Sequence, residues 1–206
     1  NHGRYMGWVH GSSLISLIGG EDAWIGDNYK ISIAASALSS IGLGRLGYSF
    51  GKNKPWEEGY VALLKHYGGL MSATGFFVAT SFFDDPRAFG GSVLLFGAGG
   101  YLLSDMIYKL NPYTRGEVRA ISACSGLHGL LGYGVAFDRG LENEFANTNW
   151  LFPAAGLLAG TGIGHLWLNN TNLTPQQGNF TGYAATGGAI LGLGIALIID
   201  SSIFTP

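Results

Sequence analysis

Ionisable side chains inside long apolar stretches are the residues of this chain whose types allow chemistry. Lys65 and His66 lie together in one stretch, Asp105 in the next and His128 in a third. If these stretches cross a membrane, such residues are functional candidates by default, because a charge is costly in hydrocarbon. These four residues therefore form our candidate polar path. The simpler interpretation, which we favour, is a snorkelling Lys65 beside a hydrogen-bonded His66 near the membrane interface.

The remaining reactive side chains form no catalytic or metal-binding pattern. Metal sites need three or four converging ligands, often spaced as His-x-x-x-His, and the five histidines lack that spacing. We expect each histidine to donate a hydrogen bond to a backbone carbonyl, and Cys124 to be a small core residue. The sequence thus predicts no catalytic residue, no metal site, no cofactor and no enzymatic activity.

The composition indicates a lipid-facing protein or a very tightly packed helical one. Charged residues make up 12% of the 206 residues, about half the globular average. Glycine, at 35 residues, is far more frequent than usual, and aromatic residues reach 13%. The net charge of -2 gives no basis for nucleic-acid binding, so nucleic acid is not expected as a partner.

Glycine triplets with the same internal spacing occur three times along the chain. Each lies in an apolar stretch that follows an Asn and a Pro, and another Gly-rich apolar segment precedes each Pro. Self-similarity of this kind predicts three copies of one structural unit. The triplets are Gly59, Gly69 and Gly75; Gly116, Gly126 and Gly132; and Gly178, Gly188 and Gly194.

The apolar stretches read as helices and not as strands. An outer-membrane β-barrel needs apolar and polar residues to alternate, whereas residues 59–83 and 92–110 are apolar on consecutive positions. Thr114 with Glu117, and Thr174 with Gln177, have the spacing of a helix capping box. Apart from this capping role, we interpret Glu117 as a polar residue at the membrane interface, where its negative charge suits the N-terminal end of the helix dipole.

Each predicted helix is close to the roughly 20 residues that a bilayer core requires. The fold class predicted is all-α, a six-helix membrane bundle made of three Gly-rich helical hairpins with a pseudo-threefold repeat. The predicted helix pairs are 31–50 with 56–83, 91–110 with 114–137, and 152–168 with 175–199. The corresponding boundaries are an N-terminal extension at 1–30, hairpin repeats at 31–84, 90–138 and 151–200, and a tail at 201–206. The apolar part of the extension is too short to span, so we expect it to be interfacial or re-entrant.

In lipid, the glycines allow helices to pack against one another. Helices there gain little hydrophobic energy by associating, so close backbone approach at small residues holds them together. We therefore assign all nine triplet glycines to helix packing, between the hairpins and against partner subunits.

The loop charges predict an orientation. Basic residues gather at the hairpin tips, and most acidic residues lie at the opposite ends. By the positive-inside rule, the tips are expected in the cytoplasm, although the third tip is neutral. The basic tip residues are Arg45, Lys52, Lys54, Lys109, Arg115 and Arg119.

The succession of a Gly-rich helix, an Asn/Thr-Pro turn and a second Gly-rich helix over about 31–199 resembles the glycine-zipper-type helical-hairpin repeat proteins of bacterial envelopes. The resemblance implies packed helical hairpins in a bacterial envelope and transfers no functional residue. We expect an integral membrane structural or assembly subunit, with the lipid bilayer and other protein subunits, of the same or another kind, as partners. The alternative is a small pore or carrier with its path between the three hairpins.

Overall fold

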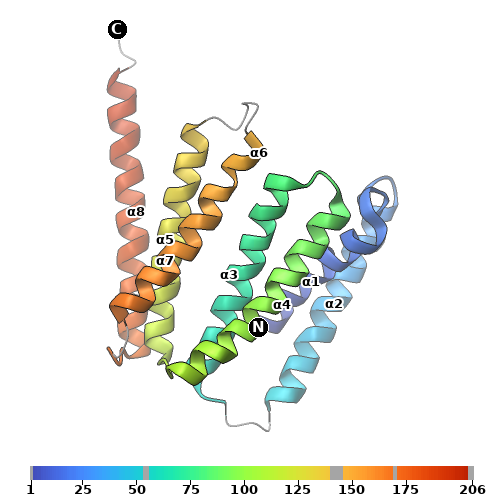
Figure 1. Ribbon diagram of the computed structural model, residues 1–206, viewed down its shortest axis with the longest axis horizontal. Coiled ribbons are helices and arrows are strands. Elements are labelled where there is room, and N and C mark those ends of the chain that lie inside the picture. The colour runs from blue at the N-terminus through green and yellow to red at the C-terminus, as the bar shows by residue number, and fades with distance from the viewer. Residues whose placement is uncertain (1, 53–55, 140–145, 169–170, 204–206) are drawn as a thin grey trace.

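The computed structural model describes residues 2–52, 56–139, 146–168 and 171–203 (Figure 1). Within these ranges the chain is mostly helical, with short turns between the helices, and contains no strand, so the all-α prediction is confirmed. The elements are α1 (His2–Gly19), the 3-10 helix η1 (Gly20–Trp24), α2 (Asn28–Gly51), α3 (Glu58–Phe82), α4 (Pro86–Leu110), α5 (Arg115–Asp138), the short α6 (Ala146–Asn149), α7 (Leu151–Leu168) and α8 (Pro175–Ile203).

Three of these helices, α4, α5 and α7, are long and apolar enough to cross a membrane. The six-helix count is not confirmed, because the described residues contain seven long helices. The additional one is α1, which arises from the segment predicted as an interfacial or re-entrant extension. It packs along α2 and α4.

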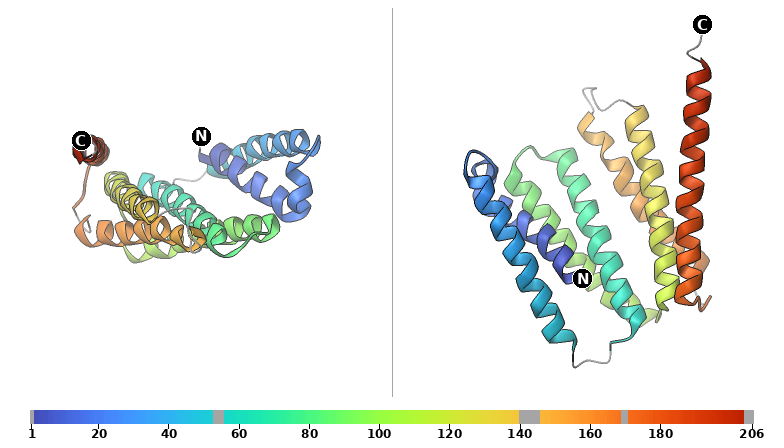
Figure 2. Two further views of the ribbon diagram at one scale, coloured as in Figure 1. Left: turned by 90° about the horizontal axis from the view of Figure 1, so that it is seen from above. Right: turned by 180° about the vertical axis from the view of Figure 1, so that it is seen from behind.

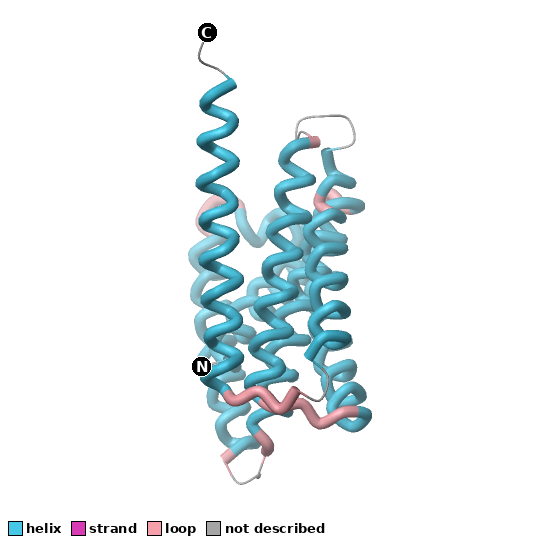
Figure 3. The backbone as a smooth tube through the Cα atoms, turned by 90° about the vertical axis from the view of Figure 1, so that its left-hand side faces the viewer, coloured by secondary structure: helices cyan, strands magenta, loops and turns pink. Residues whose placement is uncertain are grey.

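The helices form a broad array in two layers, with α8 at one end and the α1–α2 pair at the other (Figure 2, left). The most extensive contacts join α1 with α2, α3 with α4, and α5 with α7. Helix α5 also packs on α8, and α3 contacts both α5 and α7. Figure 3 shows α8 running past the ends of its neighbours.

These pairs differ from the predicted hairpins, in which α2 would pack on α3, α4 on α5, and α7 on α8. None of those three pairs forms a substantial interface among the described residues. The reason lies in which backbones can approach closely. Gly75 of α3 lies against Ser92 and Phe96 of α4, and Gly132 of α5 lies against Phe152 of α7. The turn that contains Pro112 therefore leads from the α3–α4 pair to the α5–α7 pair.

The helix starts follow the local sequence closely. Thr114 and Glu117 form the predicted capping box at the start of α5, and Thr174 and Gln177 make the corresponding hydrogen bonds at α8. Asp85 caps α4 in addition, since its side chain accepts from the backbone N–H of Arg87.

Glu117 connects the start of α5 to the turn before α8 and is more than a polar residue at an interface. Its side chain is buried and accepts hydrogen bonds from the backbone N–H groups of Thr114 (2.7 Å) and Asn172 (2.8 Å) and from the Thr171 hydroxyl (3.2 Å). Thr114 in turn donates to the carbonyl of Leu173. The turn before α8 is thus attached to α5 by polar contacts, which explains why α8 begins beside α5.

The largest buried cluster lies where α3 meets α5. It consists of Leu63, Tyr67 and Leu70 of α3 with Tyr113, Val118 and Ile121 from the start of α5 and the turn before it. This cluster fixes the relative position of the two helices that carry most of the polar residues described next.

Candidate functional site

The first glycine of each triplet lies against backbone from a neighbouring segment. A Cβ on Gly59 would overlap the carbonyl oxygen of Tyr113, and one on Gly116 would overlap the carbonyl oxygens of Leu173 and Thr174. A Cβ on Gly178 would overlap the carbonyl oxygen of Gly116. No larger residue fits at these three helix starts without moving backbone.

The third glycines lie within the packed helix pairs. A Cβ on Gly75 would be 2.9 Å from the carbonyl oxygen of Ser92 and 2.8 Å from the Cβ of Phe96. A Cβ on Gly132 would overlap the carbonyl oxygen of Phe152. The surroundings of Gly194 lie outside the described residues.

The middle glycines differ from the other two sets. At Gly69, Gly126 and Gly188, no described atom outside the helix's own nearby backbone lies within 4 Å of where a Cβ would stand. The described part of the chain therefore supplies no helix packed against these three positions. Spacing alone did not separate them from the glycines that are tightly enclosed.

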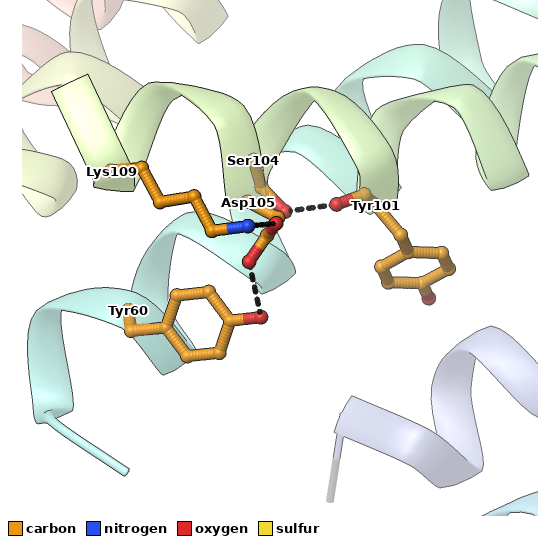
Figure 4. Close-up of polar contacts among 5 residues, drawn as sticks. All are labelled: Tyr60, Tyr101, Ser104, Asp105 and Lys109. Carbon is orange, nitrogen blue, oxygen red and sulfur yellow. Dashed lines mark hydrogen bonds and ion pairs between the residues drawn. The ribbon is translucent and has the colours of Figure 1, made fainter.

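The four residues of the candidate polar path do not meet at one place. Asp105 lies on α4, where it pairs with Lys109 (2.6 Å) and accepts a hydrogen bond from the Tyr60 hydroxyl of α3 (3.3 Å) (Figure 4). His128 lies on α5, with its Nδ1 2.8 Å from the Cys124 carbonyl oxygen of its own helix. Only Lys65 and His66 remain together, near the start of α3.

His66 joins three helices through two hydroxyl groups. Its Nδ1 lies 3.0 Å from the Ser122 Oγ of α5, and its Nε2 lies 3.3 Å from the Thr161 Oγ1 of α7. Both hydroxyls also lie within hydrogen-bond distance of carbonyls in their own helices. A neutral imidazole donates from one nitrogen only, so one hydroxyl must direct its proton to the ring.

Beside the first, a second histidine bridges α7, α3 and the turn before α5. His165 of α7 is hydrogen-bonded through Nε2 to the Tyr67 hydroxyl of α3 (2.6 Å) and through Nδ1 to the Tyr113 hydroxyl (2.7 Å). Both tyrosines are buried. Because one ring nitrogen donates and the other accepts, the bridge orders the protons of both tyrosines. We call His66, Tyr67, Tyr113, Ser122, Thr161 and His165 the buried polar cluster; Tyr67, Tyr113 and Thr161 are buried, and the other three are half-buried.

Chemically, the buried polar cluster can satisfy its own polar groups and fix the contact of α3, α5 and α7. Fully paired buried networks of this kind rigidify a core and specify one arrangement of it. Among the described residues, no three His, Cys, Asp or Glu side chains converge as metal ligands would. The Ser122 and Thr161 hydroxyls, which contact His66, also lie within hydrogen-bond distance of carbonyls of their own helices.

An open cleft of about 590 Å³ lies between the first turns of α3 and α5 and shares His66 and Ser122 with the buried polar cluster. Its lining carries three cations, one carboxylate and one histidine, together with Trp56 and small apolar side chains. We call it the basic cleft. Its lining residues are Trp56, Glu58, Val61, Ala62, Lys65, His66, Arg115, Val118, Arg119 and Ser122.

Sequence reasoning selected Lys65 and His66 but missed most of their surroundings. The Tyr67–His165 contact joins residues 98 apart in the chain, and the Tyr113–His165 contact joins residues 52 apart. No local pattern encodes such pairs. The available signal for His165 was its position among the glycines of α7, where a neighbouring helix can approach the ring closely.

The fold and the buried polar cluster define an all-α protein with three helices suited to crossing a membrane. No protein-family model, no curated protein and no solved structure matches the chain.

Proposed function

We propose that this protein is an integral membrane structural or assembly subunit of a bacterial envelope, without enzymatic activity. The observation that carries the proposal is the inverted distribution of residue size in two of the three candidate membrane helices, α4 and α7. In α4 the buried residues are Gly90, Val93, Gly97, Gly100 and Ser104. The large side chains of the same helix point outward, among them Leu95 (73% exposed) and Leu102 (71% exposed).

Helix α7 has the same distribution. Its buried residues include Ala154, Gly160 and Gly164, whereas Leu166 and Trp167 are exposed. A protein folded in water places its large apolar groups inside, because their removal from water drives folding. In lipid that gain disappears, and small residues at the helix contacts allow close van der Waals packing. The two helices therefore fit lipid as their solvent.

The assembly part of the proposal is supported by α8. Gly187, Gly188 and Gly192 of α8 have no described atom within 4 Å of a Cβ position, and Tyr183 and Ile190 are exposed. Small residues beside exposed apolar ones provide a surface for another membrane helix. The similar contacts of Gly59 with Tyr113 and of Gly116 with Leu173 support three related units.

The alternative, a pore or carrier, needs polar residues that converge on one path. Asp105 bonds to Tyr60 and Lys109, whereas His128 bonds to its own helix. Because these side chains serve separate contacts, the geometry favours the structural role. We propose further that the end carrying Lys109, Arg115 and Arg119 faces the cytoplasm.

Cross-linking in native membranes, followed by purification in mild detergent, tests the assembly role. We expect the protein to run as a complex larger than its 21.7 kDa chain. Gly188→Leu should dissociate that complex, whereas Gly162→Leu on α7, where a Cβ also meets open space, should leave it intact. A wild-type protein that is monomeric in membranes would remove the assembly role.

A further inference from the structure

We propose that the basic cleft binds the phosphate-bearing headgroup of an anionic phospholipid. The inference rests on the proposed membrane location, but not on the proposed assembly role. The cleft lies between two helices that begin at the same end of the molecule, since Gly59 at the start of α3 contacts Tyr113 just before α5. Basic pockets between membrane helices are known sites for anionic headgroups.

The charge of the lining is complementary to such a headgroup. Lys65, Arg115 and Arg119 contribute three positive charges and Glu58 one negative charge, which gives a net +2 with His66 neutral. Glu58 pairs with Arg115 at 3.2 Å, and Arg119 donates one hydrogen bond to the Pro175 carbonyl. A guanidinium has five N–H donors, so both arginines keep donors for phosphate oxygens.

Unlike Arg115 and Arg119, Lys65 has no partner among the residues that the structure describes. Its side chain is exposed, and among the described residues it has no hydrogen bond or ion pair. It lies about 10 Å along the helix axis from Glu58, the first residue of α3. A free ammonium at that depth from the helix start, beside the hydrogen-bonded His66, is placed to contact a phosphate that enters between α3 and α5.

The faces that form the cleft continue into a smooth surface suited to an acyl chain. On α3 the lining residues Glu58, Ala62 and Lys65 lead to Gly69 on the same helical face, at about 100° per residue. On α5 the residues Arg115, Arg119 and Ser122 lead in the same way to Gly126.

Both glycines have open space where a Cβ would stand. A lipid with its phosphate among the cations therefore has room for its tail over Gly69 and Gly126. This position gives the two middle glycines a role that helix packing within the chain does not supply. It also favours a lipid over a small soluble anion, which would need no such apolar surface.

Lipid retention measured by native mass spectrometry from mixed micelles tests the headgroup contact. Wild-type protein should retain phosphatidylglycerol in preference to phosphatidylcholine. Lys65→Gln should reduce that preference about fivefold, and Lys65→Gln with Arg119→Gln about thirtyfold, since each cation near an anionic lipid contributes at this scale. Lys109→Gln on α4 is the matched control, a lysine near the same end but outside the cleft, and should retain the preference.

A second pair of variants tests the acyl surface. Gly126→Leu should reduce phosphatidylglycerol retention, while Gly162→Leu on α7, which is equally open, should not. The proposal is wrong if Lys65→Gln and the double variant keep the wild-type preference. It is also wrong if inorganic phosphate alone binds as tightly as phosphatidylglycerol and with the same dependence on Lys65, because the ligand is then a soluble anion.

Either outcome that overturns the lipid proposal can be distinguished from an error in the proposed membrane location. Carbonate extraction of native membranes measures that location independently of any lipid preference. Lys65→Gln is expected to fold normally, because the side chain it shortens has no partner among the described residues. Thermal unfolding of each variant in detergent verifies this before lipid retention is compared.

Discussion

Gly59 and Gly69 lie on the same helix in opposite surroundings. A Cβ at Gly59 would overlap the Tyr113 carbonyl, whereas a Cβ at Gly69 meets no described atom within 4 Å. Glycine therefore has two separable effects here. At Gly59 it permits close backbone approach, whereas at Gly69 it packs against no described part of the chain and lowers the intrinsic stability of the helix.

This contrast predicts different outcomes for the same substitution. Gly59→Ala should lower the free energy of unfolding by about 2–3 kcal/mol through overpacking. Gly69→Ala should leave it unchanged or raise it by up to about 1 kcal/mol, because alanine is the better helix former. Denaturant unfolding of the purified protein in detergent measures both, and equal effects would contradict the packing described for Gly59.

His165 offers a second prediction at the residue scale. His165→Phe leaves the buried hydroxyls of Tyr67 and Tyr113 without their ring nitrogens and should destabilise the protein by about 1–3 kcal/mol. Adding Tyr67→Phe and Tyr113→Phe should recover part of that loss, since no unpaired hydroxyl then remains. His128→Phe is the control and should cost less, because among the described residues the His128 ring contacts Cys124 of its own helix and bridges no other helix. No recovery in the triple variant would contradict the bridging role.

At the scale of elements, the turn before α8 depends on one buried carboxylate. Glu117 accepts from Asn172 and Thr171 as well as from Thr114. Glu117→Ala removes these acceptors and should destabilise the protein by about 3 kcal/mol, with the largest gain in hydrogen exchange at the start of α8.

The matched control for Glu117 is Glu58, which forms an exposed ion pair with Arg115 at the start of α3. Glu58→Ala should cost less than about 1 kcal/mol, because exposed pairs contribute little. If both variants have the same effect, or if exchange at the start of α8 does not change, Glu117 does not hold the turn in place.

The helices themselves could be predicted from the sequence because their signals are local. Thr114 with Glu117 and Thr174 with Gln177 marked two helix starts, and the uninterrupted apolar stretches excluded strands. The pairing of helices could not be predicted in this way. A glycine such as Gly75 shows that some backbone can approach, but not whether it belongs to α2 or to α4.

The candidate site was predictable to the same limited extent. Lys65 and His66 were selected because ionisable residues are conspicuous in an apolar stretch. Their partners Ser122 and Thr161 are ordinary small residues of other helices, and only the folded arrangement brings them to His66. Asp105 was selected on the same ground, and its partners Tyr60 and Lys109 form a separate contact (Figure 4).

At the scale of the whole molecule, substitutions of the exposed leucines of α4 test whether lipid or water surrounds this helix. Leu95→Arg, near the middle of α4, should impair membrane insertion by about 2.5–3.5 kcal/mol. Leu110→Arg, at the end of the same helix, should be tolerated, because arginine there reaches the interface. Both side chains are exposed, so in water neither change should matter. The fraction of each variant inserted into membranes measures the difference.

Membrane residence itself is tested most directly by extraction of the native protein from its membranes. The inverted residue sizes of α4 and α7 predict that the protein stays in the membrane pellet through a carbonate wash at high pH and dissolves only in detergent. Release into the supernatant by carbonate alone would contradict the membrane location, and with it the proposed structural role.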